Sequence, residues 1–174
     1  FDIIASNRNL AGAEIELINI DKREFVLKSL IATIKDNYDI ILIDCPPSLS
    51  LITINALTAA NSILVPIQCE YYALEGLSDL LNTIQLMQRS LNPDLKLLGI
   101  LRTMYDKRNN LAQQVSEQLL EYFGDMVFYA TIPRTVRLAE APSYGVSAYA
   151  IDSRSLGSEA YYRLGKEVIK CLSM

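Results

Sequence analysis

Residues 38–47 read YDIILIDCPP, and this stretch decides the fold class. Four consecutive apolar residues at positions 40–43 are followed at once by Asp44 and then by two prolines. Short continuous runs of β-prone apolar residues are typical of strands that are buried on both faces, as in parallel sheets. The stretch therefore predicts a strand of a parallel sheet, with the carboxylate of Asp44 at its carboxyl end.

The same pattern of apolar runs and helical stretches continues along the chain. Further runs predict strands at 62–68, 96–103 and 126–132. Apolar residues recur at helical spacing over 22–35, 49–60, 72–91, 111–122 and 155–174. Alternation of strands and helices predicts an α/β fold, a Rossmann-like and mostly parallel sheet with helices on both faces. A length of 174 residues fits a single α/β domain over 1–174.

Composition excludes several kinds of site. The chain has no histidine, which rules out a Ser-His-Asp triad, a Cys-His pair and a histidine metal site. Its three cysteines are too far apart for a CxxC pair, and such sparse thiols favour a reducing cytoplasm. We expect Cys45 and Cys69 to be small buried hydrophobic residues. The net charge of −4 limits any nucleic-acid contact to a local basic patch.

Four loops follow the predicted strands, at 44–51, 68–74, 102–110 and 133–145. In open α/β sheets the loops at the carboxyl ends of the strands build the ligand site. A carboxylate such as Asp44 is costly to desolvate unless a cation or hydrogen-bond donors receive it. The sequence leaves two roles open for Asp44, namely holding Mg²⁺ through a water molecule or capping the following helix, a duty that Ser48 could share.

A phosphate-binding loop is missing from these 174 residues. The chain has seven glycines, and no GxxxxGK[ST] or GxGxxG pattern occurs among them. No run of glycine-rich backbone can therefore wrap a triphosphate with consecutive N–H groups. Taken alone, the sequence carries half of a nucleotide site. It begins at Phe1 in what we interpret as the middle of a strand, so we expect a fragment or a processed product.

The whole stretch 38–84 resembles the ParA/Soj family of chromosome- and plasmid-partitioning ATPases, members of the MinD/ParA superfamily with a deviant Walker A motif. The resemblance continues in NLAGAEIEL at 9–17, TMYDKRNNLAQQV at 103–115 and IPRTVRLAEAPSYG at 132–145. It implies a P-loop NTPase-type domain that is truncated at its N-terminus, because the family's phosphate-binding loop would lie before Phe1. It also implies that this chain alone neither binds ATP tightly nor hydrolyses it.

Intact members of that family bind ATP and Mg²⁺, form a nucleotide-dependent homodimer and bind DNA nonspecifically. They hydrolyse ATP when a ParB/Spo0J-type protein stimulates them, and they are cytoplasmic and associated with the nucleoid. The resemblance gives Asp44 the Walker B role, in which it holds a water molecule on Mg²⁺. It places Thr103, Pro133 and Arg134 beside the adenine, and Glu70 near the dimer face, within reach of the partner's nucleotide.

Arg108 and Arg137 resemble arginines through which the family's dimers bind DNA. The residues themselves leave simpler roles open, since Arg108 stands beside Asp106 and Lys107 and could belong to a solvated charge cluster. Arg137 could pair with Glu140, or could share one side of a helical turn with Arg134.

Two other functions remain open from the sequence. One is a non-enzymatic module that binds DNA or a partner. The other is a MinD-like membrane-associated ATPase, because the last helix is amphipathic. We expect its apolar stripe to pack on the sheet and not on a membrane, since no separate targeting tail follows it.

Overall fold

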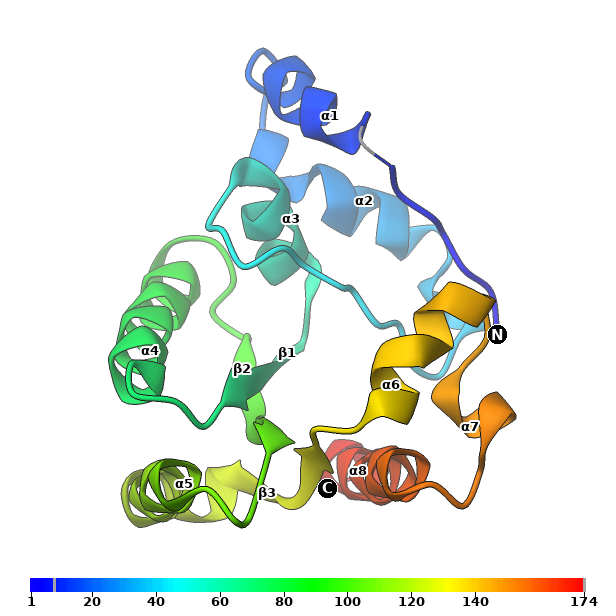
Figure 1. Ribbon diagram of the computed structural model, residues 1–174. Helices are drawn as coiled ribbons and strands as arrows, with labels where there is room; N and C mark the ends of the chain where they lie inside the picture. Colours follow the sequence, from blue (N-terminus) through cyan, green and yellow to red (C-terminus); the bar gives the residue numbers. More distant parts are fainter. Residues whose placement is uncertain (8, 174) are drawn as a thin grey trace. The chain divides into compact units, whose positions relative to one another are not determined.

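The computed structural model describes residues 1–7 and 9–173 (Figure 1). The chain divides into two compact units. The first contains Phe1–Ser62 and Thr83–Lys96, and the second contains Ile63–Asn82 and the residues from Leu97 onward.

The first unit is helical, and a buried asparagine joins its helices. Its helices are α1 (Leu10–Leu17), α2 (Val26–Ala32), α3 (Leu51–Ala59) and the second half of α4 (Ala73–Ser90), with 3-10 turns at Arg23–Phe25 and Lys35–Asn37. Buried Asn55 of α3 accepts a hydrogen bond from the backbone N–H of Leu27 at 3.1 Å and donates to the carbonyl of Arg23 at 2.8 Å. Because a buried amide is stable only when it is hydrogen-bonded, Asn55 fixes how α2 packs on α3.

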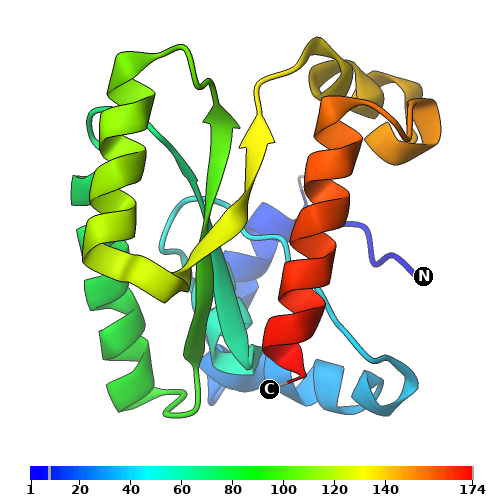
Figure 2. The ribbon, with the colours of Figure 1, turned by 90° about the horizontal axis from the view of Figure 1, so that it is seen from below.

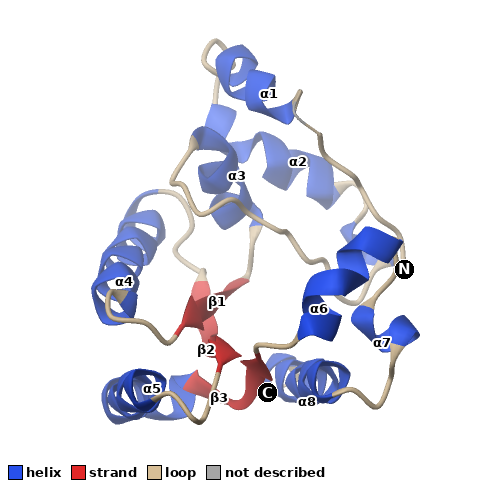
Figure 3. Ribbon diagram, in the orientation of Figure 1, coloured by secondary structure: helices blue, strands red, loops and turns tan. Residues whose placement is uncertain are grey.

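The second unit is built on a three-stranded sheet, drawn in red in Figure 3. Its strands are β1 (Ser62–Gln68), β2 (Lys96–Tyr105) and β3 (Val127–Pro133), in the order β1-β2-β3. Strands β2 and β3 run parallel. The predicted α/β class with a parallel sheet is therefore confirmed.

Helices cover both faces of this sheet, with α5 (Asn110–Phe123) and α8 (Leu156–Leu172) on opposite sides (Figure 2). On the α5 side the core includes Leu77, Ile100, Val115 and Leu119. On the other side Ala160 and Leu164 of α8 pack on side chains of β2 and β3, namely Leu101, Phe128, Ala130 and Ile132. The apolar stripe of the last helix thus packs on the sheet, as expected from the sequence.

Polar residues define where the helices of the second unit begin and end. The side chain of Asn109 accepts hydrogen bonds from the backbone N–H groups of Leu111 and Ala112 and so caps the start of α5. Gly124 follows the helix with a φ of +50°, a conformation that side chains disfavour, and it ends α5. Ser155 caps α8 by accepting from the N–H of Ser158.

Most predicted elements are confirmed, but the strand expected over residues 38–47 is wrong. This stretch forms no strand, and Leu42 in its centre is 88% exposed. The apolar run has the right composition, but a strand also needs a hydrogen-bonded neighbour. Within the described residues the sheet contains β1, β2 and β3 alone.

Two smaller expectations also need correction. Cys45 is exposed rather than buried, because it follows the unpaired stretch, whereas Cys69 is buried in the core as expected. The expected loop at 133–145 folds instead into α6 (Val136–Glu140) and a 3-10 helix at Ala141–Tyr144, and α7 (Ala148–Ile151) follows. The reason is local, since the side chain of Thr135 accepts from the N–H of Leu138 and starts α6.

A pair of glycine substitutions tests the packing of the sheet. A Cβ at Gly99 in β2 would lie 2.6 Å from the ring of Phe128 and 3.1 Å from the carbonyl of Met126. We expect Gly99→Ala to lower the free energy of unfolding by about 2 kcal/mol through overpacking. Gly76→Ala in α4 is the control, since a Cβ added there would have nothing within 4 Å. It should raise the free energy of unfolding by about 0.5–1 kcal/mol, because alanine favours a helix more than glycine does. Urea denaturation measures both, and equal effects would contradict the packing described.

Candidate functional site

An open cavity of about 690 Å³ lies at the carboxyl ends of β2 and β3. Its wall includes Tyr105 at the end of β2 and Pro133 at the end of β3. Cationic side chains are prominent around it, from Lys107, Arg108, Arg134 and Arg163. This is the edge at which parallel α/β sheets bind ligands, so the cavity is the candidate site of the second unit.

The structure brings together three of the residues singled out in the sequence. Arg108, Pro133 and Arg134 all line the cavity, although Arg108 follows β2 and the other two lie at the end of β3. Thr103, Glu70 and Arg137 do not line it. Asp44 belongs to the first unit.

Arg108 forms a tight ion pair with Asp106. Its Nε and Nη2 donate to the two carboxylate oxygens at 3.0 and 2.8 Å, and its side chain is 90% exposed. These hydrogen bonds lower the pKa of Asp106 to about 2, so the carboxylate stays charged at any neutral pH. A phosphate that binds Arg108 must therefore compete with Asp106, and the solvated charge cluster left open by the sequence is present.

Arg137 and Arg134 do not share a helical turn. Arg134 precedes Thr135, which caps α6, whereas Arg137 lies within that helix. Nη1 of Arg137 lies 3.8 Å from Oε2 of Glu140, which is the pairing that the sequence left open. The side chain is 63% exposed, so this pair contributes little to stability.

Thr103 and Glu70 stand apart from the cavity for different reasons. Strand β2 extends to Tyr105, so Thr103, the last residue of the predicted strand, lies inside β2 and the loop begins later than expected. Its hydroxyl donates to the carbonyl of Ile67 at 3.2 Å and joins β2 to β1. Glu70 is exposed in the turn that follows β1. The backbone N–H of Glu70 donates to the carbonyl of Gln68 and closes this turn.

Asp44 is an exposed carboxylate in the first unit. It does not cap the following helix, because α3 begins at Leu51 with Ser50 at the cap position. Among the described residues no three His, Cys, Asp or Glu side chains gather to hold a metal ion. A lone carboxylate fits a magnesium site of the kind that phosphates and water molecules complete, and it does not fit a site made of protein ligands alone.

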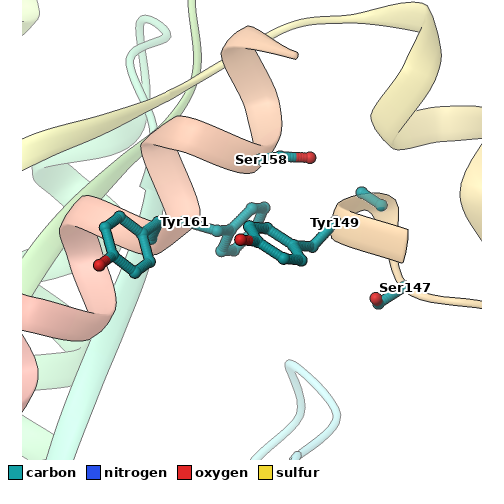
Figure 4. A pocket seen from close by; sticks show the side chains of 6 residues that line it. Ser147, Tyr149, Ser158 and Tyr161 are labelled. Carbon is teal, nitrogen blue, oxygen red and sulfur yellow. The ribbon is translucent and has the colours of Figure 1, made fainter. Parts of the chain in front are cut away.

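A second, smaller cavity of about 360 Å³ was not predicted from the sequence (Figure 4). It lies between α7 and α8, and Tyr149, Tyr161 and Tyr162 line it together with Ser147 and Ser158. Lys166 lies over the ring of Tyr162, with its Nζ 4.5 Å from the ring centroid. Spacing on α8 could have placed Tyr162 and Lys166 together, but nothing in the sequence indicated that α7 would fold back onto them.

No helix within residues 1–7 and 9–173 combines the length and the apolar character that crossing a membrane requires.

Comparison with known proteins supports a specific family. A family described as an AAA domain matches residues 1–97. The chain is 56% identical over 167 residues to the sporulation initiation inhibitor protein Soj of Bacillus subtilis. This match covers 96% of this chain and 66% of that protein. It is 52% identical over 168 residues to the chromosome partitioning protein ParA of Myxococcus xanthus, covering 97% of this chain and 59% of that one.

The fold is also similar to that of a solved structure. Cobyrinic acid a,c-diamide synthase from Mycobacterium smegmatis, with bound ADP and magnesium, superposes with a TM-score of 0.80 and 36% identity, over 97% of this chain and 61% of that one. The chain spans less than two thirds of the length of the curated relatives named above. It belongs to the AAA domain family and, within that family, to the Soj/ParA group.

Proposed function

We propose that this chain is the larger part of a partitioning ATPase of the Soj/ParA type, and that its two units are parts of one ATPase domain. The observation that carries the proposal is the 56% identity with Soj of Bacillus subtilis over 96% of the chain. Such a protein converts ATP and water to ADP and phosphate, and the reaction acts as a timer for DNA-bound dimers. The cargo is a chromosome or a plasmid.

Asp44 is the residue that we assign to the Mg²⁺ site. Bound Mg²⁺ supplies neutralisation of the phosphate charge during phosphoryl transfer. Asp44, as the single carboxylate, would hold one of the water molecules around the ion, while phosphates of the nucleotide supply the remaining charge. The Mycobacterium smegmatis structure holds ADP and magnesium, which supports a nucleotide with Mg²⁺ as the ligand.

The cavity at the ends of β2 and β3 supplies the adenine contacts in this proposal. Pro133 and Arg134 would flank the adenine, and Thr103 would support them from within β2. Glu70 would reach the nucleotide of the partner in a homodimer. A ParB/Spo0J-type protein would stimulate hydrolysis, and Arg108 and Arg137 would bind DNA phosphates without reading sequence.

Calorimetry with Mg-ATP tests the nucleotide half of the proposal. The two samples are this chain alone and a chimera in which it replaces the matching 167 residues of Bacillus subtilis Soj. We expect the chimera to bind Mg-ATP and the 174-residue chain not to bind it, because the chain has no glycine-rich phosphate loop. A folded chimera that binds no nucleotide would contradict the proposal, as would tight binding by the chain alone.

DNA binding is predicted to depend on the two arginines and on Asp106. In the ATP-bound chimera, Arg108→Ala and Arg137→Ala should each reduce the salt dependence of binding to a nonspecific duplex by about one unit of slope. Asp106→Asn should strengthen binding, because it releases Arg108 from its ion pair. Exposed Arg89 in the first unit provides the control, as Arg89→Ala.

Fluorescence anisotropy over a range of salt concentrations measures these effects. Unchanged salt slopes in both arginine variants would refute the assigned DNA surface. Binding by the 174-residue chain without nucleotide, lost in the same variants, would instead support the non-enzymatic module.

A further inference from the structure

Strand β3 is irregular just before it reaches the cavity. Ile100 of β2 pairs with Val127, and Arg102 pairs with Thr131. Strand β2 thus advances two residues while β3 advances four, so β3 carries extra residues in a bulge between these pairs. Bulges bend a strand and re-aim the residues that follow, here Pro133 and Arg134.

A carboxylate from α8 holds this bulge. Oε2 of Glu167 accepts from the backbone N–H of Tyr129 at 2.9 Å, and Oε1 accepts from that of Ala130, also at 2.9 Å. In a regular strand successive residues face opposite ways, so one carboxylate can receive two successive N–H groups only where the strand is bent. Hydrogen bonds to a charged carboxylate are about twice as strong as neutral ones.

Arg102 holds the same bulge from β2. Its guanidinium donates to the carbonyl of Phe128 at 2.9 Å and to the hydroxyl of Ser116 in α5 at 2.8 Å. The side chain is buried, and its Nε has no hydrogen-bond partner. A buried guanidinium with an unpaired donor is costly, so the hydrogen bonds to Phe128 and Ser116 are what hold Arg102 against the bulge.

The bulge and its holder are also part of the cavity. Tyr129, Ala130 and Glu167 line it together with Pro133 and Arg134. A shift in β3 at Tyr129 therefore moves the wall of the cavity and the two residues at its rim.

We infer that Glu167 is a positioning residue, which fixes the bulge of β3 and thereby sets where Pro133 and Arg134 meet a nucleotide. The role in nucleotide binding rests on the proposed function, whereas the hold on the bulge does not. Glu167 acts through the backbone of β3 and needs no contact with the ligand.

Amide hydrogen exchange of the 174-residue chain, resolved by NMR, tests the hold on the bulge. Glu167→Gln keeps one acceptor and presents an NH₂ group to the other N–H, so one of the Tyr129 and Ala130 amides should exchange at least about tenfold faster. Glu167→Ala should affect both amides. Glu117→Gln, an exposed change on α5, should affect neither. Unchanged exchange in Glu167→Ala would overturn the inference.

The second readout is steady-state hydrolysis by the Soj chimera. Glu167→Gln should raise the KM for ATP several-fold with little change in kcat, because the substrate contacts move while the Mg²⁺-holding Asp44 stays unaltered. Faster exchange with an unchanged KM would overturn the positioning role. A wild-type chimera without hydrolysis would count against the proposed function and leave the exchange result intact.

Discussion

Asp44→Ala should reduce ATP hydrolysis by the Soj chimera at least about a hundredfold, because a group that organises Mg²⁺ around the phosphates acts on the transition state itself. The loss should be large because no other residue can replace Asp44: within the described residues, no three metal-binding side chains lie together. The measurement is the steady-state rate of phosphate release under saturating Mg-ATP.

Asp39→Ala is the matched control for this change. Asp39 lies in the same exposed stretch, five positions earlier, and has no assigned role. Its variant should hydrolyse ATP at the wild-type rate. Equal rates in Asp44→Ala and Asp39→Ala would contradict the assignment of Asp44 to the Mg²⁺ site.

Leu119→Ala should lower the free energy of unfolding by about 3 kcal/mol, the usual cost of a cavity in a packed core. Leu119 in α5 is fully buried, at 0% exposure, in the core cluster with Ile100 and Val115. Its neighbour Leu120 points outward and is 43% exposed.

Leu120→Ala therefore serves as the control and should cost less than about 1 kcal/mol, since it opens no cavity. Urea denaturation followed by circular dichroism measures both variants. Similar losses for the two substitutions would contradict the packing of α5 on the sheet.

The second unit was predictable because its strands are covered on both faces. The runs at 62–68, 96–103 and 126–132 are mostly apolar, and they form β1, β2 and β3. Helices α5 and α8 carry apolar stripes, and Asn109 and Gly124 delimit α5. Local composition and tertiary burial therefore agree in these elements.

The run at 40–43 carries the same composition and forms no strand, because pairing depends on a neighbour that composition does not specify. The cavity was predictable in its position, since it lies at the carboxyl ends of β2 and β3. Its bulge was not, because a register shift leaves no periodic signal. Glu167 also gave no signal, since a glutamate beside the apolar stripe of α8 is ordinary in sequence.

Arg102 marks the limit of sequence reasoning most clearly. The sequence placed it where the predicted strand at 96–103 meets the polar loop at 102–110, whereas the structure buries it inside β2. Two acceptors, the hydroxyl of Ser116 and the carbonyl of Phe128, make this burial possible. They lie 14 and 26 positions away in the chain, so no local pattern could have identified them.

The central claim is that this chain supplies most of a partitioning ATPase. The most direct test is the rate of ATP hydrolysis by the Soj chimera, measured with and without DNA and the ParB-type partner of Bacillus subtilis. We predict slow hydrolysis that rises when both are added. A chimera that is folded and binds Mg-ATP, but hydrolyses nothing under either condition, would contradict the claim.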